Sequence, residues 1–169
     1  MKKISLILLQ LLILPLLCAS LPWYGKNNSE TADLIIGNWK PSNGRSVVTM
    51  YKGVAKNGED PAKYYGKIVW LLDQNDDKGQ PRRDVNNSDL NKRNVPLKGL
   101  VIVKDMVFKE IDGNIVKWDG GSIYDPNNGS EYSFSAEIDK KNKMVLDARG
   151  FIGVSLFGRT DTWTKLVKK

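Results

Sequence analysis

Gly37-Asn38-Trp39 begins the first strand-like run of this chain, and Gly158-Arg159-Thr160-Asp161-Thr162-Trp163 begins the last. Between these two stretches the sequence has the pattern of short strands separated by tight turns. The run 131–139 is the clearest, because apolar and polar residues alternate at every step, as in a strand with one buried face. This series predicts an all-β chain whose first and last strands meet and close the sheet.

Further strands are predicted where β-branched and aromatic residues lie between turn residues. They are expected at residues 45–52, 64–72, 106–111, 115–118, 122–124, 144–151 and 157–167. Asp112-Gly113-Asn114 and Asp119-Gly120-Gly121 are interpreted as turns, because glycine readily takes the positive φ that hairpins need. The count of about eight strands suits a single antiparallel barrel with room for side chains or one small ligand.

The run 64–72 carries apolar residues on both of its faces. Strict alternation puts Trp70 on the same face as Ile68. We therefore expect either that the outer side of this strand is covered or that its edge packs against a loop.

Residues 1–20 have the pattern of a signal peptide. Lys2 and Lys3 precede an apolar run, and Cys18-Ala19-Ser20 supplies small residues for cleavage after Ser20. The apolar run is too short for a membrane span, so no transmembrane helix is expected in the mature chain. The protein is predicted to be exported to the periplasm or cell surface, with lipid anchoring through Cys18 as the alternative.

The rest of the chain is long enough for one domain. Residues 21–33 are interpreted as an extended lead-in, and residues 34–167 as the β-barrel domain. Cys18 is the only cysteine of the chain, so the barrel is expected to fold without disulfides. The formal net charge of +7 includes Lys2 and Lys3, and the modest excess that remains does not indicate a nucleic-acid partner.

The chain contains no histidine, which excludes Ser-His-Asp and Cys-His catalysis and metal sites built on imidazole. No cofactor and no metal site is predicted. Carboxylates remain available for acid–base chemistry. Asp119, Asp125 and Glu131 therefore define an alternative function, a hydrolase or lyase acting on envelope carbohydrate.

The segment 73–98 is polar and much longer than the usual connection of about 4–6 residues. We expect it to be an ordered lid, pinned to one mouth of the barrel by four apolar residues: Leu90, Val95, Leu97 and Leu100. A solvated loop is one alternative. A calcium-held loop that uses Asp73, Asp76, Asp77 or Asp84 is another.

Several motifs occur in order along the chain. They are Gly37-Asn38-Trp39, Tyr65-Gly66-Lys67-Ile68-Val69-Trp70, residues 84–93, Pro96-Leu97-Lys98-Gly99-Leu100, residues 118–126, Gly129-Ser130-Glu131-Tyr132, Arg149-Gly150-Phe151 and residues 158–163. Together they resemble the exported bacterial family named domain of unknown function 2147. More distantly, Gly-X-Trp on the first strand with an arginine on the last resembles the lipocalin-like (calycin) barrels. That resemblance implies a barrel in which Arg159 packs across Trp39 and closes one end.

Four residues are candidates for ligand binding: Trp39, Trp70, Trp118 and Arg159. Each of them also has a purely structural interpretation, because indole rings are common in cores and an arginine over an indole stabilises a fold. The sequence favours a non-catalytic barrel that binds a small apolar or amphipathic ligand, or docks an envelope component, over an enzyme.

Overall fold

The computed structural model describes residues 29–155 and 158–167. The predicted signal peptide and Cys18 lie outside the described residues, as does Phe157 in the predicted last strand. Among the described residues, no helix is long and apolar enough to span a bilayer.

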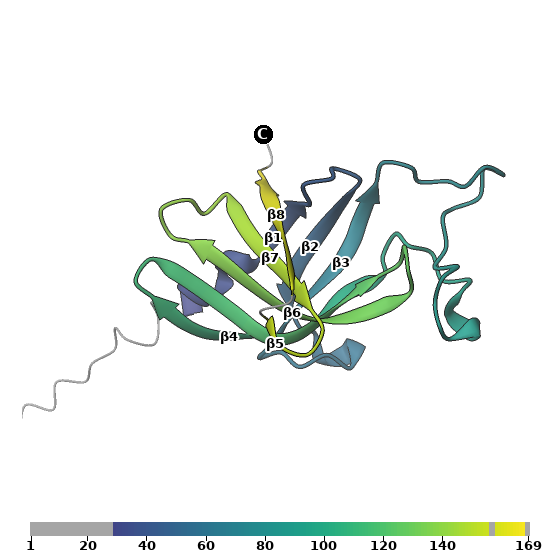
Figure 1. Ribbon diagram of the computed structural model, residues 1–169. Helices are drawn as coiled ribbons and strands as arrows, with labels where there is room; N and C mark the ends of the chain where they lie inside the picture. The colour runs from purple at the N-terminus through teal and green to yellow at the C-terminus, as the bar shows by residue number, and fades with distance from the viewer. Residues whose placement is uncertain (1–28, 156–157, 168–169) are drawn as a thin grey trace, which may run out of the picture.

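The chain forms a closed barrel in which each strand pairs with the next and the last pairs with the first, always antiparallel (Figure 1). The strands are β1 (Gly37–Lys40), β2 (Ser46–Lys52), β3 (Tyr64–Leu71), β4 (Val101–Asp112), β5 (Ile115–Asp125), β6 (Ser130–Asp139), β7 (Val145–Phe151) and β8 (Arg159–Leu166). The all-β, eight-stranded, lipocalin-like barrel predicted from the sequence is confirmed. In β6 the predicted alternation also holds, with Phe134, Ala136 and Ile138 buried inside.

The predicted turn at Asp119-Gly120-Gly121 is wrong, because both glycines lie within β5. The register between β5 and β6 shifts between Trp118 and Gly121, so these residues form a bulge. A Cβ on Gly121 would lie 2.5 Å from the Lys104 carbonyl oxygen of β4. Here glycine allows two strands to approach closely, rather than allowing the chain to reverse.

The predicted position of Trp70, on the same face as Ile68, is wrong because β3 contains a second bulge. Val47 of β2 pairs with Trp70, but Val48 pairs with Ile68, which leaves Val69 as an extra residue. The extra residue reverses the alternation of β3 beyond this point. Trp70 is therefore on the outside with 36% of its surface exposed, while Leu71 faces the interior.

The outer face of β3 is covered at Tyr65, but Lys67 and Trp70 on the same face are exposed, so the predicted covering holds only for the start of the strand. The Tyr65 side chain is buried outside the barrel beneath the segment that joins β2 and β3, which contains the short 3-10 helix η2 (Ala55–Asn57). Its hydroxyl accepts the Asp60 backbone N–H at 3.0 Å and donates to Asp105 Oδ1 at 3.0 Å.

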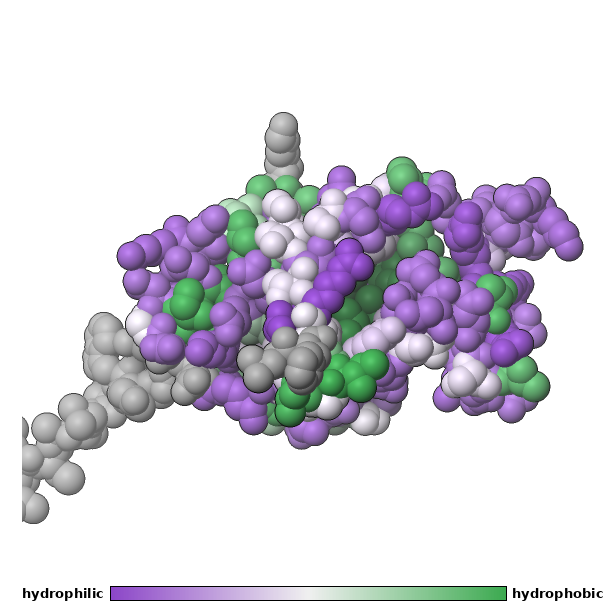
Figure 2. Space-filling view, viewed as in Figure 1, coloured by the Kyte–Doolittle hydropathy of each residue, from purple (hydrophilic) through white to green (hydrophobic). Residues whose placement is uncertain are grey.

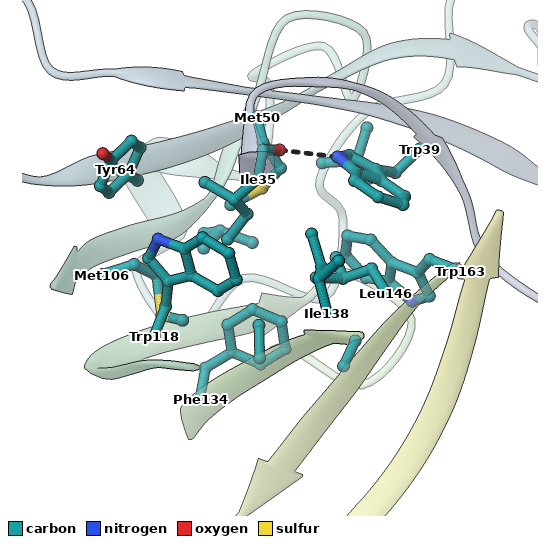
Figure 3. Packing of buried hydrophobic residues seen from close by; sticks show 14 of the residues in the cluster. Ile35, Trp39, Met50, Tyr64, Met106, Trp118, Phe134, Ile138, Leu146 and Trp163 are labelled. Atoms are coloured by element: carbon teal, nitrogen blue, oxygen red, sulfur yellow. Dashed lines mark hydrogen bonds between the residues drawn. The ribbon is translucent and has the colours of Figure 1, made fainter. Parts of the chain in front are cut away.

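A helical segment closes one end of the barrel, where its Ala32 and Ile35 join the buried cluster. Figure 3 shows Ile35 among these side chains, with its hydrogen bond to Trp39 dashed. Residues 29–32 are helical and continue into the 3-10 helix η1 (Asp33–Ile35), so the predicted extended lead-in is wrong over residues 29–33. Two tryptophans donate to its carbonyls: Trp39 Nε1 to Ile35 at 2.7 Å and Trp118 Nε1 to Ala32 at 3.1 Å. The barrel thus supplies donors for carbonyls that a short helix leaves unpaired.

The cation over Trp39 is Lys165, not Arg159. Lys165 pairs with Trp39 across β1 and β8, and its Nζ lies 5.0 Å from the indole ring centroid. The same ammonium group donates to the Leu34 carbonyl at 2.9 Å. Arg159 is six residues earlier on β8, or about 20 Å away along the strand. Gly37, two residues before Trp39, has a φ of 138°, which side chains rarely adopt, and this conformation explains the glycine.

The connection between β3 and β4 is a long loop beside the opposite end of the barrel (Figure 1). Isolated bridges join Asn75 to Pro81 and Arg83 to Pro96 within it, and it contains the 3-10 helix η3 (Leu90–Lys92). We call residues 72–100 the long loop below.

Candidate functional site

The end of the barrel opposite the helical segment is open and contains a cavity of about 550 Å³. Figure 2 shows apolar surface in a recess, with hydrophilic surface on its borders. The inner wall is mainly apolar and is formed by Ile68, Leu71, Ile102, Ile123, Phe134, Ala148, Gly150 and Trp163. The rim comes from the turns at this end and from the long loop, and it is polar.

Small residues on β7 keep this end open. Gly150 lies opposite Arg159 of β8, and Ala148 lies opposite Asp161. A Cβ on Gly150 would make only ordinary contacts of 3.7 and 3.9 Å, so there is space above it. At the base of the cavity Trp163 packs against Phe134, with 6.1 Å between ring centroids.

Charged groups of both signs line the rim, and several of them already have partners within the protein. Arg45 is paired with Asp73 at 2.5 Å. Asp125 Oδ1 accepts two N–H groups of Asn127, and Asp161 Oδ2 accepts the indole N–H of Trp163 at 2.9 Å.

Arg159 lines the same cavity and is exposed to solvent. Its side chain makes no hydrogen bond or ion pair with any residue that the structure describes. Its guanidinium donors are therefore available to a bound molecule.

The long loop forms one wall of the cavity through Asp73, Arg82 and Leu97. Its anchor is Asp84, a fully buried carboxylate. Asp84 accepts the Tyr124 hydroxyl at 2.7 Å and the Asn87 side-chain amide at 2.6 Å. Burial and the neighbouring Asp84 carboxylate raise the pKa of Tyr124 to about 12.

A backbone contact also fixes the loop, since a Cβ on Gly129 would lie 1.9 Å from the Asn86 carbonyl oxygen. The Asn86 side chain donates to the carbonyls of Pro126 and Asn127. The loop is thus held by polar contacts to the turn between β5 and β6.

The four apolar pins predicted for the long loop divide into two pairs. Leu90 is 68% exposed and Val95 38% exposed, so the prediction is wrong for these two residues. Leu97 is half-buried in the cavity wall, and Leu100 packs against the core. The long loop is attached mainly through the buried carboxylate of Asp84, rather than through the four apolar residues predicted from the sequence.

A second cavity, of about 720 Å³, lies between the long loop and strands β4 to β6. It is larger, but many of its lining side chains are charged and already interact with one another: Lys92 with Asp89, Lys104 with Glu131, and Tyr124 with Asp84. The first cavity combines an apolar wall with an available cation, and we take it as the candidate site.

The carboxylates of the alternative function do not converge. Asp125 lines the first cavity, Glu131 lines the second, and Asp119 lines neither. Asp119 accepts the backbone N–H of Gly120, and Glu131 accepts the Ser122 hydroxyl. Each carboxylate therefore has a local structural role.

The acids of the long loop are likewise dispersed. Asp73 pairs with Arg45, Asp76 accepts backbone N–H groups of Lys78 and Gln80, and Asp84 holds Tyr124. Over residues 29–155 and 158–167, no three histidine, cysteine or acidic side chains are grouped as metal ligands would be.

The structure brings only one of the four sequence-predicted site residues to the cavity. Trp39 and Trp118 lie in the core at the closed end, Trp70 is outside the barrel, and Arg159 lines the cavity. Three residues that form the cavity were not among the candidates from the sequence: Ala148, Gly150 and Asp161. The signal was present, because two small residues on one face of a strand indicate space inside a barrel.

Residues 37–165 match the family described as "uncharacterized protein conserved in bacteria", domain of unknown function 2147 (DUF2147). Because the match covers most of the sequence, the chain belongs to this family. No curated protein matches the chain closely enough to be identified as a relative.

A similar solved structure is that of the protein HP1028 from Helicobacter pylori, described as belonging to the lipocalin family. It shares 19% sequence identity with this chain and superposes with a TM-score of 0.61. The match covers 79% of this chain and 83% of HP1028. At this level of identity the similarity shows the fold, which is a lipocalin-like barrel.

Proposed function

We propose that this protein binds a small amphipathic molecule in the open end of its barrel and does so without catalysis. The observation that carries the proposal is the cavity of about 550 Å³, with an apolar wall inside and polar groups at its rim. Such a site holds the apolar part of a ligand out of water, and burial contributes about 0.8 kcal/mol for each CH₂ group. The lipocalin-like fold supports the same function.

A titration with N-phenyl-1-naphthylamine, an uncharged fluorophore, tests this proposal. We expect saturable binding to the wild-type protein and loss of binding in Gly150→Leu, whose side chain would occupy the cavity. Thr164→Leu is the matched control, because Thr164 is exposed and its neighbour Trp163 faces inward. The proposal is overturned if the wild-type protein does not bind the fluorophore, or if a folded Gly150→Leu binds it as well as wild type.

We also propose that the protein is exported and cleaved after Ser20, which places the barrel in the envelope. The support is the sequence Lys2-Lys3, the apolar run after it, and the small residues at 18–20. Intact-mass measurement of the protein purified from its native cells should find a chain that begins at Leu21. A lipid-modified chain that begins at Cys18 would contradict cleavage after Ser20 and establish anchoring instead.

A further inference from the structure

The rim of the cavity carries three arginines from three separate segments: Arg45 before β2, Arg82 in the long loop, and Arg159 at the start of β8. Three aspartates, Asp73, Asp125 and Asp161, also line the cavity. The balance of formal charge is therefore even, and the preference of the site depends on which of these groups retain free hydrogen-bonding capacity.

Each of the three aspartates already has a hydrogen-bond or ion-pair partner within the protein. Asp73 forms an ion pair with Arg45. Asp125 accepts hydrogen bonds from Asn127, and Asp161 accepts one from the Trp163 indole. The Trp163 indole N–H donates to Asp161 Oδ2 at 2.9 Å, so one oxygen of this carboxylate is already used. No ion pair joins Asp161 and Arg159 in the described structure.

The basic groups are less engaged. Arg159 pairs with Gly150 across the β7–β8 ladder, so its cross-strand partner on β7 has no side chain that could bind the guanidinium. Arg82 makes no side-chain hydrogen bond within the described residues, although Asp76 lies close enough to interact electrostatically. The backbone of Arg82 is fixed by hydrogen bonds to Gln74 and Leu97, which hold its side chain at the rim.

We infer that the ligand of this cavity is an amphiphile with an anionic head group, a carboxylate or a phosphate, which Arg159 binds with help from Arg82. The inference rests on the proposed function and names its ligand class. Guanidinium donors match the two oxygens of such a head group, and these charge-assisted hydrogen bonds are strong. The apolar tail would lie against Trp163 and Phe134 at the base of the cavity.

Displacement of N-phenyl-1-naphthylamine by four amphiphiles with the same twelve-carbon chain tests the inference. They are dodecanoate, dodecyl phosphate, dodecanol and dodecylammonium, each used below its micelle concentration. We expect the better of the two anions to bind about 10- to 100-fold more tightly than dodecanol, from the usual contribution of a charged hydrogen bond. Comparison of the two anions distinguishes carboxylate from phosphate ligands.

Variants of the rim arginines test whether these residues cause the preference for an anionic head group. Arg159→Gln should weaken binding of the preferred anion by about tenfold or more, while displacement by dodecanol stays close to the wild-type value. Arg82→Gln should have a smaller effect in the same direction. Lys143→Gln removes one positive charge from the exposed turn between β6 and β7 at the closed end, and it should change neither affinity because distant charges are screened.

The outcomes separate the two proposals. If the fluorophore itself does not bind, the proposed function fails. If it binds and dodecanol competes as well as either anion, only the anionic head group is excluded. Tighter binding of dodecylammonium would show that Asp125 and Asp161 govern the site and would overturn the inference. The wild-type series decides these points even if Arg159→Gln does not fold.

Discussion

The two ends of this barrel are built from the same strands but differ in what fills them. At the closed end, large inward side chains meet a helical segment whose carbonyls accept hydrogen bonds from Trp39, Trp118 and Lys165. At the open end, small residues on β7 leave a cavity, and a polar loop forms its wall. The comparison shows that tryptophans on the inner face have different surroundings at the two ends: Trp39 and Trp118 are packed in the core, whereas Trp163 lies at the base of the cavity.

The largest effect that we expect is at the closed end. Trp39→Ala should lower the free energy of unfolding by about 3–5 kcal/mol, the usual result of emptying a buried aromatic site. Trp70→Ala removes the same side chain from the outer surface and is the matched control, with an expected loss of less than about 1 kcal/mol. Urea unfolding followed by circular dichroism measures both values. Equal losses of unfolding free energy in the two variants would contradict the placement of Trp39 in the core and Trp70 on the surface.

An identical substitution in the two halves should sharpen the comparison. In Gly66→Ala the new Cβ would lie 2.6 Å from Met50 Sδ and 3.0 Å from Val103 Cβ. We expect a loss of about 1–3 kcal/mol from overpacking. In Gly150→Ala the new methyl group enters the cavity, and stability should stay the same or rise by up to about 1 kcal/mol. Thermal unfolding of both variants provides the test, and a large loss in Gly150→Ala would show that the open end is filled.

The smallest effect concerns the attachment of the long loop. Because an unfolded tyrosine titrates near pH 10 and the pKa of Tyr124 is raised to about 12, the unfolded chain loses this proton first. The stabilising contribution of the Tyr124–Asp84 hydrogen bond is therefore complete below about pH 10 and disappears as the pH rises through about 12.

Ultraviolet titration of phenolate formation checks this pH dependence, and Tyr124→Phe identifies the relevant step. Asp84→Asn should move that step toward lower pH, because it removes the charge that disfavours the phenolate. Asp77→Asn changes a loop carboxylate for which no side-chain bond is described, and should leave the titration as it is. A Tyr124 step near pH 10 in the wild-type protein would contradict the attachment by Asp84.

Most of the strands and the buried face of β6 followed from alternation, because in these strands each residue takes one step along a regular ladder. The position of Trp70 did not, because a single extra residue, Val69, reverses the faces of β3 and leaves no mark in a sequence pattern. The turn predicted at Gly120 and Gly121 is a bulge, and the sequence does not separate the two because glycine is common in both.

The candidate site was predicted less well than the fold. Arg159 was identified through a family resemblance, but that resemblance placed it over Trp39, where Lys165 lies instead. Both side chains point inward from β8 and both are cationic, so only the register of β8 against β1 distinguishes them. The anchor of the long loop was missed because a buried carboxylate such as Asp84 has the same local sequence signal as a solvated turn residue.

The pairing of β1 with β8 also sets an order of events in synthesis. The strand that completes the barrel leaves the ribosome after the other seven, and the Lys165–Leu34 hydrogen bond joins residues separated by 131 positions. Contacts of such high contact order form late and slowly. Until β8 is available, β1 and β7 each present an unpaired strand edge, which is prone to join another chain. A chain that stays unfolded until β8 has emerged avoids this exposure, so this topology favours folding that begins only after β8 is available.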